Sequence, residues 1–358
     1  MNIRKILPFI FASALVFNVA CSNDDTIEEV ITAPKGVYEN GILISDEGGF
    51  STPTSNVSFI SNDLSTVENK IYSTNNNNEN LGNVLQSIGF SGDQAYLVSN
   101  VPNKIDIVNR YTFKKQTTVT SNLDNPRYIA FSGNQYYVTN NNFFDVMKMN
   151  VYNTADNSYA KSISFPRSAE KIVEAGGNIF VQTDGVTYQT VAPYGELPTG
   201  YTITVVTPST NTIDKVITLP SNGIIRDLIA YNGKSYVLAS DNTNSYIYEL
   251  NASAGTYQTT TLTAIPQAQK LRITDNKIYF TTSGNKIYTM NFGSTTVPTA
   301  PLATSTGNLY GFNVIDGRIY VSDANYSGDS KVNVYDATSG TLLQTFATGI
   351  ATNGFYKN

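Results

Sequence analysis

A tight turn followed by a short apolar strand recurs seven times along this chain of 358 residues. The bulky residues at the strand centres are Leu43, Tyr96, Tyr137, Phe180, Tyr236, Tyr279 and Tyr320. The steps between them are 53, 41, 43, 56, 43 and 41 residues, near the ~40 to 50 expected when each repeat is one four-stranded propeller blade. The sequence therefore predicts an all-β fold, a seven-bladed β-propeller whose loops gather around a central channel.

One repeat shows the four strands of a blade. Residues 125–131 and 135–139 form two short β-branched and aromatic runs around the turn Ser132-Gly133-Asn134, which is the pattern of a hairpin. A third strand is predicted at 146–149 and a fourth at 159–163. No helical periodicity is visible after residue 40.

The chain is predicted to close its own ring. Residues 353–358 match the innermost strand of the other repeats, whereas the first repeat starts at its second strand, residues 41–44. The last strand would then complete the first blade and pair an otherwise open sheet edge. We therefore expect one domain, residues 37–358.

The N-terminus predicts secretion. Arg4-Lys5, the apolar run 6–19 and Ala20 read as a signal peptide, residues 1–20, too short to span a membrane. Cys21 is the only cysteine and resembles the lipidated cysteine of bacterial lipoproteins, with Asn18 where these usually carry Leu. An ordinary signal peptide and a buried structural thiol are the alternatives.

Residues 21–36 are predicted to form a flexible tether. The acidic stretch at 22–29 resembles the signal that, in some Gram-negative groups, directs lipoproteins to the outer face of the outer membrane. A solvated linker with incidental charge is the alternative.

A family resemblance is visible within the repeats. Tyr137-Val138-Thr139-Asn140 spells the YVTN propeller repeat, and residues 125–140 resemble the YncE-like surface lipoproteins grouped as DUF5074. The runs at 38–41, 87–90 and 334–340 are similar to the same group. The resemblance implies a lipoprotein above a TonB-dependent outer-membrane transporter, with cobalamin or a related corrinoid as ligand. It transfers no contact residues, because no short ligand motif defines the group.

Composition excludes several kinds of chemistry. The chain has no histidine, which removes His-based triads, His metal sites and the usual proton shuttles. Carboxylates at Asp46-Glu47, Asp323 and Asp329 are the remaining acid/base route, but such residues at strand ends more often form turns. We expect no enzymatic activity and no cofactor or metal.

Charge also limits the partners. The net charge is −5 and charged residues make up 14% of the chain, which argues against nucleic acid. A surface rich in Asn, Thr, Ser and Tyr suits uncharged ligands better than phosphates.

The predicted loops differ between the two faces of the propeller. Those joining strands one to two and three to four are uniform tight turns, whereas the other face carries long, variable loops, the usual site of recognition. The predicted long loops are 45–56, 74–83, 139–145, 182–201, 239–245, 304–310 and 322–331. The candidate ligand-binding residues on that face are Asp46, Phe50, Arg127, Asn140, Phe143, Phe144, Arg226, Tyr310, Asp323 and Tyr326.

Each candidate has a structural alternative. Phe143 and Phe144 either form a binding platform or pack on the neighbouring blade. Arg127 and Arg226 either grip a ligand or pair with Asp124 and Asp227.

Three functions follow from these patterns. The first is capture of a small nutrient at the cell surface, with transfer to a TonB-dependent transporter. The second is a protein- or glycan-binding adhesion module, which calls for a broad apolar patch. The third is a glycan hydrolase or lyase, which calls for two acids facing each other across the channel.

Overall fold

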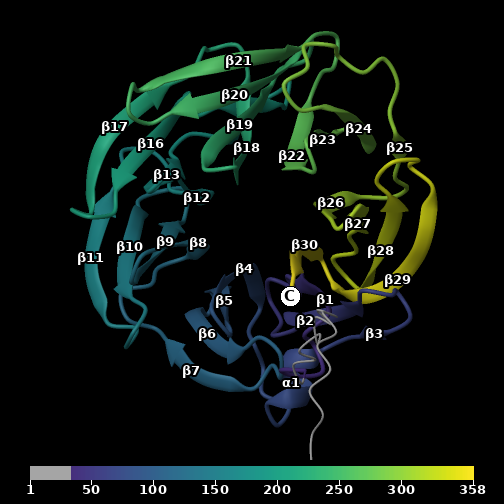
Figure 1. Cartoon of the computed structure of the whole chain (residues 1–358). Coiled ribbons are helices and arrows are strands. Elements are labelled where there is room, and N and C mark those ends of the chain that lie inside the picture. The colour runs from purple at the N-terminus through teal and green to yellow at the C-terminus, as the bar shows by residue number, and fades with distance from the viewer. Residues whose placement is uncertain (1–33) are drawn as a thin grey trace, which may run out of the picture. The chain divides into compact units, whose positions relative to one another are not determined.

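The computed structural model of the protein describes residues 34–358. Residues Lys35–Asn358 form one compact unit. Within it, seven four-stranded antiparallel sheets are arranged in a ring around a centre (Figure 1). The predicted seven-bladed propeller is therefore confirmed. The predicted signal peptide, Cys21 and most of the tether lie outside the described residues.

The strands of each sheet follow, from the innermost strand outward. The first sheet consists of β30 (Thr352–Lys357), β1 (Gly41–Asp46), β2 (Asn56–Ser61) and β3 (Val67–Glu68). The second consists of β4 (Val84–Ser91), β5 (Gln94–Val101), β6 (Asn103–Asn109) and β7 (Lys115–Val119). The third consists of β8 (Pro126–Ser132), β9 (Gln135–Asn141), β10 (Met147–Asn153) and β11 (Tyr159–Ser164). The fourth consists of β12 (Ile172–Ala175), β13 (Asn178–Gln182), β16 (Thr202–Thr207) and β17 (Thr212–Thr218).

The remaining sheets complete the ring. The fifth consists of β18 (Ile224–Tyr231), β19 (Lys234–Ser240), β20 (Ser245–Asn251) and β21 (Thr256–Leu262). The sixth consists of β22 (Ala268–Thr274), β23 (Lys277–Thr282), β24 (Lys286–Asn291) and β25 (Ala303–Thr304). The seventh consists of β26 (Leu309–Ile315), β27 (Arg318–Asp323), β28 (Asp329–Asp336) and β29 (Leu342–Ile350). A separate hairpin, β14 (Val186–Tyr188) and β15 (Glu196–Pro198), lies between β13 and β16.

The C-terminal strand closes the ring as predicted. β30 pairs antiparallel with β1, with Ile42 opposite Lys357 and Ile44 opposite Phe355. Figure 1 shows the yellow end of the chain beside the purple first strands. The closing contact is also packed, because Phe355 lies in one buried cluster with Ile42 and Tyr320.

The turns between first and second strands are as uniform as expected. Six sheets use two-residue turns, and the first residue of each has a positive φ of 47–57°, which favours Gly, Asn and Asp. These first residues are Gly92, Gly133, Gly176, Asn232, Asp275 and Asp316.

One expectation about local structure was wrong, and one short helix was missed. The connection from β24 to β25, residues 292–302, is long, although a tight turn was expected there. One helix, α1 (Ile71–Asn75), follows β3 and buries Ile71 and Tyr72. Its five residues are too few to show a helical period of 3.6.

We predict that Phe355→Ala destabilises the protein by about 3 to 5 kcal/mol, because it removes a buried aromatic ring from the closing contact. Chemical denaturation measures the free energy of unfolding. Phe144→Ala is the matched control, since that ring is 85% exposed, and we expect a change within about 0.5 kcal/mol. Equal effects of both substitutions would contradict a closing role for Phe355.

Candidate functional site

The innermost strands share an irregularity near their first residues. In six of the seven, the register with the next strand shifts, and one or two residues are left without a partner. These residues are Gln86, Arg127, Tyr128, Arg226, Gln269, Tyr310, Gly311 and Asn353. Bulges of this kind redirect side chains and are common next to functional sites.

Several of the unpaired residues line a cavity of about 260 Å³ in the central channel. We call this the channel mouth, and its main polar residues are Gln86, Arg127, Lys171, Lys270, Tyr310 and Asn353. They lie at the starts of the innermost strands, directly after the loops that connect one sheet to the next. The channel mouth therefore opens on the face that carries the long loops, the long-loop face.

The channel continues below its mouth. A second cavity of about 400 Å³ shares Tyr128, Lys171, Arg272 and Asn313 with the first. It is also lined by Asp227, which is completely buried. Basic residues thus surround both cavities.

Most of these charges are paired across neighbouring blades. Asp227 pairs with Lys171 and, at 3.2 Å, with Arg272. Burial alone would raise the pKa of Asp227, but the charges of Lys171 and Arg272 outweigh it and hold the pKa below its usual value. Asp227 therefore stays ionised and joins three sheets.

The predicted partners of two arginines were wrong. Arg127 pairs with Glu170 at 3.2 Å and not with Asp124, and Arg226 pairs with Glu196 at 2.5 Å and not with Asp227. Arg226 and Asp227 are adjacent on one strand, and successive side chains of a strand point to opposite faces. Glu170 lies in the loop before the fourth sheet, and Glu196 lies on β15 of the separate hairpin.

Aromatic side chains are exposed around this face. In residues 34–358, seven aromatic residues are exposed, and six of them lie on loops joining second to third strands. The six are Phe50, Phe143, Phe144, Tyr188, Tyr194 and Tyr326. Phe144 is 85% exposed, so it does not pack on the neighbouring blade.

Two of these rings extend the channel mouth. The ring of Phe143 lies 5.2 Å from the guanidinium of Arg127, a cation–π contact. Tyr326 packs edge-on against Tyr310, with ring centroids 5.8 Å apart. The Tyr310 hydroxyl donates a 2.7 Å hydrogen bond to Glu47.

Three other predicted ligand residues support the scaffold. Asp46 and Asn140 are completely buried, so neither presents an atom to a ligand. Asn140 accepts a hydrogen bond from the Asp124 backbone N–H at 2.9 Å. Asp323 accepts one from the Asn308 N–H at 2.8 Å and so fixes the loop before β26.

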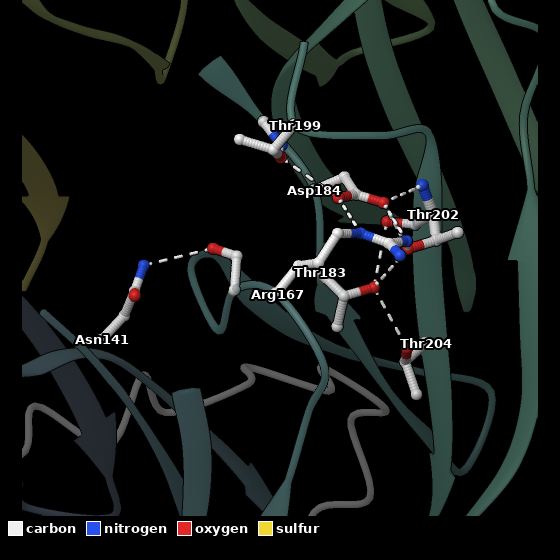
Figure 2. Close-up of polar contacts among 9 residues, drawn as sticks. Asn141, Arg167, Thr183, Asp184, Thr199, Thr202 and Thr204 are labelled. Atoms are coloured by element: carbon white, nitrogen blue, oxygen red, sulfur yellow. Dashed lines mark hydrogen bonds and ion pairs between the residues drawn. The ribbon is translucent and has the colours of Figure 1, made fainter. Parts of the chain in front are cut away.

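A buried carboxylate anchors the largest insertion on the long-loop face. Asp184 starts the connection from β13 to β16, which we call the insert arm, residues 183–201 (Figure 2). Arg167 donates two hydrogen bonds to Asp184, at 2.6 and 2.7 Å. Thr199, near the other end of the arm, and Thr202, the first residue of β16, donate to the same carboxylate at 3.1 and 2.6 Å.

The charge of Asp184 is matched to these donors. Burial disfavours the ionised form, but the hydrogen bonds from Arg167 and Thr202 outweigh it and lower the pKa of Asp184. Gly200 allows the close approach, because a Cβ there would lie 2.5 Å from the carboxylate oxygens. The arm that carries Tyr188 and Tyr194 therefore has a fixed base.

We predict that Asp184→Ala loosens the insert arm, because both of its ends lose their common acceptor. Cleavage by chymotrypsin after Tyr188 or Tyr194 should accelerate on the order of tenfold, equivalent to about 1.4 kcal/mol of local stability. Asp316→Ala, which breaks an exposed ion pair with Lys357, is the control and should leave this rate unchanged. An unchanged rate in Asp184→Ala would refute the anchoring role.

A second buried acid makes the stability of the fold depend on pH. Asp46 accepts 2.6 Å hydrogen bonds from Ser58 and Thr352, which joins the first, second and last strands. Burial nevertheless raises the pKa of Asp46 to about 7, from an ordinary value of about 3.9. The folded state therefore binds a proton that the unfolded chain releases between these two pH values.

We predict that the free energy of unfolding falls by roughly 3 to 4 kcal/mol as pH rises from 4 to 7 through this group. The contribution is complete below the unfolded pKa and is lost as pH rises through the folded one. Urea denaturation between pH 4 and 8 measures it for wild type and for Asp46→Asn, whose amide does not ionise. Parallel curves would contradict this assignment.

The sequence analysis did not identify most of the residues that line the channel, although the sequence contains a signal for them. Counting back six residues from each first turn, or from the chain end, reaches a polar residue in every repeat. These residues are Gln86, Arg127, Glu170, Arg226, Gln269, Tyr310 and Asn353. The next position includes Lys171, Asp227 and Lys270. Of the first set, Gln86, Arg127, Tyr310 and Asn353 line the channel mouth, so polarity at this position is a usable signal for part of the lining.

Comparison with known proteins supports the fold. The family model described as "Domain of unknown function (DUF5074)" matches residues 40–356. No curated protein is detectably similar in sequence. No helix in the described part of the chain is long and apolar enough to cross a membrane.

Solved structures with this architecture are distant in sequence. A functionally unknown protein from Desulfotomaculum acetoxidans DSM 771 is 12% identical with a TM-score of 0.62, covering 89% of this chain and 98% of that one. The computationally designed Ika8 protein is 10% identical with a TM-score of 0.57, covering 87% and 90%. Dihydro-heme d1 dehydrogenase NirN in complex with DHE is 12% identical with a TM-score of 0.56, covering 91% and 77%. At these identities the similarity establishes the fold alone.

Proposed function

The chain belongs to the DUF5074 family, and from that premise we propose that it is a surface lipoprotein that binds a small nutrient on its long-loop face. The family description assigns no function, so the proposal rests on the geometry of the site. One observation carries it. The exposed aromatic side chains are concentrated on the loops of one face, around cavities lined by polar groups.

Exposed aromatic side chains gathered on one face are a common feature of binding surfaces. Here they lie on loops of four different sheets. A cavity of about 630 Å³ on the same face is lined by Glu196, Tyr201, Arg226 and Gln267. Together with the channel mouth, it gives a polar surface with aromatic edges, the usual composition of a small-molecule site.

A corrinoid, with cobalamin as the leading candidate, fits this arrangement. Its ring is a flat apolar surface edged with amides, which matches aromatic side chains beside amides such as Gln86 and Asn353. Hydrogen bonds distributed over a preorganised face favour tight binding without a covalent link. The resemblance to YncE-like lipoproteins points to the same ligand class.

The proposed place of action is the outside of the outer membrane. Cys21 would carry the lipid, and the acidic segment after it would direct export to the cell surface. A TonB-dependent transporter is the proposed partner that receives the nutrient. We propose no catalytic role, because the channel acids Glu170 and Asp227 are engaged in ion pairs and Glu47 accepts hydrogen bonds from Tyr310 and Asn353.

An adhesion module that binds a protein or glycan is the alternative. It requires one continuous apolar patch of several hundred Å². The exposed rings are instead separated by polar residues. One of these is Asn142, whose side-chain oxygen accepts hydrogen bonds from the backbone of its own loop. This arrangement favours ligand capture.

We predict that the chain from Ser22 onwards binds cyanocobalamin in calorimetric titration, and that Phe144→Ala and Tyr194→Ala each weaken binding about tenfold or more, as expected for loss of a stacking contact of about 1.5 kcal/mol. Tyr159→Ala is the matched control. Tyr159 is the one exposed aromatic residue in 34–358 outside these loops, and its removal should leave affinity unchanged.

Absence of binding to both cyanocobalamin and its precursor cobinamide would refute the corrinoid assignment. Equal losses in Phe144→Ala and Tyr159→Ala would move the site away from the long-loop face. Binding of a purified glycan or protein, sensitive to Phe144→Ala, would then favour the adhesion alternative.

A further inference from the structure

Lys270 differs from the other basic residues of the channel. Within residues 34–358 its ammonium group forms no hydrogen bond and no ion pair, and its closest aromatic neighbour is the Tyr310 ring, 5.9 Å away. Lys171, Arg127 and Arg272 each contact an acid. Within the described residues, Lys270 therefore has no direct acidic partner inside the channel mouth.

The nearby acids already form ion pairs or hydrogen bonds with other residues. Asp227 is shared by Lys171 and Arg272, and Glu170 binds Arg127 and Asn141. Glu47 is the remaining candidate, but it accepts hydrogen bonds from Tyr310 at 2.7 Å and from Asn353 at 3.3 Å, and it lies beyond ion-pair distance of Lys270. Asp227 and Glu47 act on Lys270 only through their charges, and no acid in residues 34–358 pairs with it directly.

A second donor faces the same space. Arg272 lies two residues after Lys270 on β22, so both side chains leave the same side of the strand. Arg272 uses Nε for Asn313 and Nη1 for Asp227 and the Leu271 carbonyl. Its Nη2 has no hydrogen-bond acceptor within residues 34–358, so it remains available to a ligand.

We propose that the channel mouth is a phosphate-binding site in which Lys270 is the principal cation and Arg272 a second donor. The cavity of about 260 Å³ accommodates one phosphate group, and Lys and Arg are the side chains that most often hold one. The neutral character expected for the surface as a whole does not extend into the channel. The phosphate is either a free ion or the acidic group of a larger molecule seated on the long-loop face.

The energetic cost of a Lys270 ammonium without a direct partner supports this assignment. Burial, together with the charges of Lys171 and Arg272, outweighs the opposing charges of Asp227 and Glu47 and lowers the pKa of Lys270 to about 8. The folded protein therefore disfavours the ammonium that it keeps at neutral pH. A methionine would fill similar space without that penalty. A purely structural lysine would have a partner, as the other three cations do.

The site is tested by calorimetric titration of the chain from Ser22 onwards with inorganic phosphate and, separately, with ribose 5-phosphate. We expect one site, with affinity reduced at least tenfold in Lys270→Met and in Lys270→Gln and retained within a few fold in Lys270→Arg. Lys286→Met, an exposed lysine of the same sheet, is the control and should bind as wild type. Without phosphate, Lys270→Met should melt at a higher temperature than wild type.

The outcomes separate the possibilities. Tighter binding of inorganic phosphate identifies a free ion, and tighter binding of ribose 5-phosphate identifies the acidic group of a larger ligand. No heat with either probe, or equal affinity in all variants, would overturn the proposal. A lower melting temperature for Lys270→Met would show that Lys270 stabilises the fold and would also count against it. The result is independent of whether cyanocobalamin binds.

Discussion

The pairing of the last strand with the first is the contact on which the rest of this structure depends. β30 supplies the innermost strand of a sheet whose other strands come from the start of the chain. The side chain of Asn358 then donates hydrogen bonds to the Tyr38 and Arg110 carbonyls, which ties the C-terminus to two sheets. Because the ring is closed, the spacing of the seven innermost strands is fixed before any ligand arrives, and less ordering remains to oppose binding.

Closure also determines the chemistry of the centre. Each innermost strand has one edge that no other strand covers. The backbone groups of that edge need hydrogen-bond partners, either polar side chains or water. Bulges at the strand starts place polar side chains at this position, as Arg127 and Asn353 illustrate. Charges there interact more strongly than on the outer surface, because surrounding protein excludes much of the solvent. The channel is thus the natural place for coupled ion pairs such as Asp227 with Lys171.

The fold was predictable from the sequence because strand alternation and turn residues are local signals. The closing strand could be recognised for the same reason, since residues 353–358 repeat a pattern seen six times before. The ion pairs were not predictable, because Arg127 and Arg226 reach acids 43 and 30 residues away. Burial of Asp46 was hidden as well, since its hydroxyl partners Ser58 and Thr352 come from different strands.

The buried acids and the free lysine have opposite meanings for function. Asp46 and Asp184 are each surrounded by donors that link separate segments, so their burial is explained by what they hold together. Lys270 links nothing, and the exposed rings of Phe144 and Tyr194 cover nothing. All three are unfavourable in the isolated protein, and all three belong to one face. Apart from residues 292–302, the opposite face has short turns, and it carries exposed, paired ions such as Lys357 with Asp316. These unfavourable features lie on one side of a scaffold whose buried acids are hydrogen-bonded or paired. They are best explained by a ligand that removes the penalty when it binds.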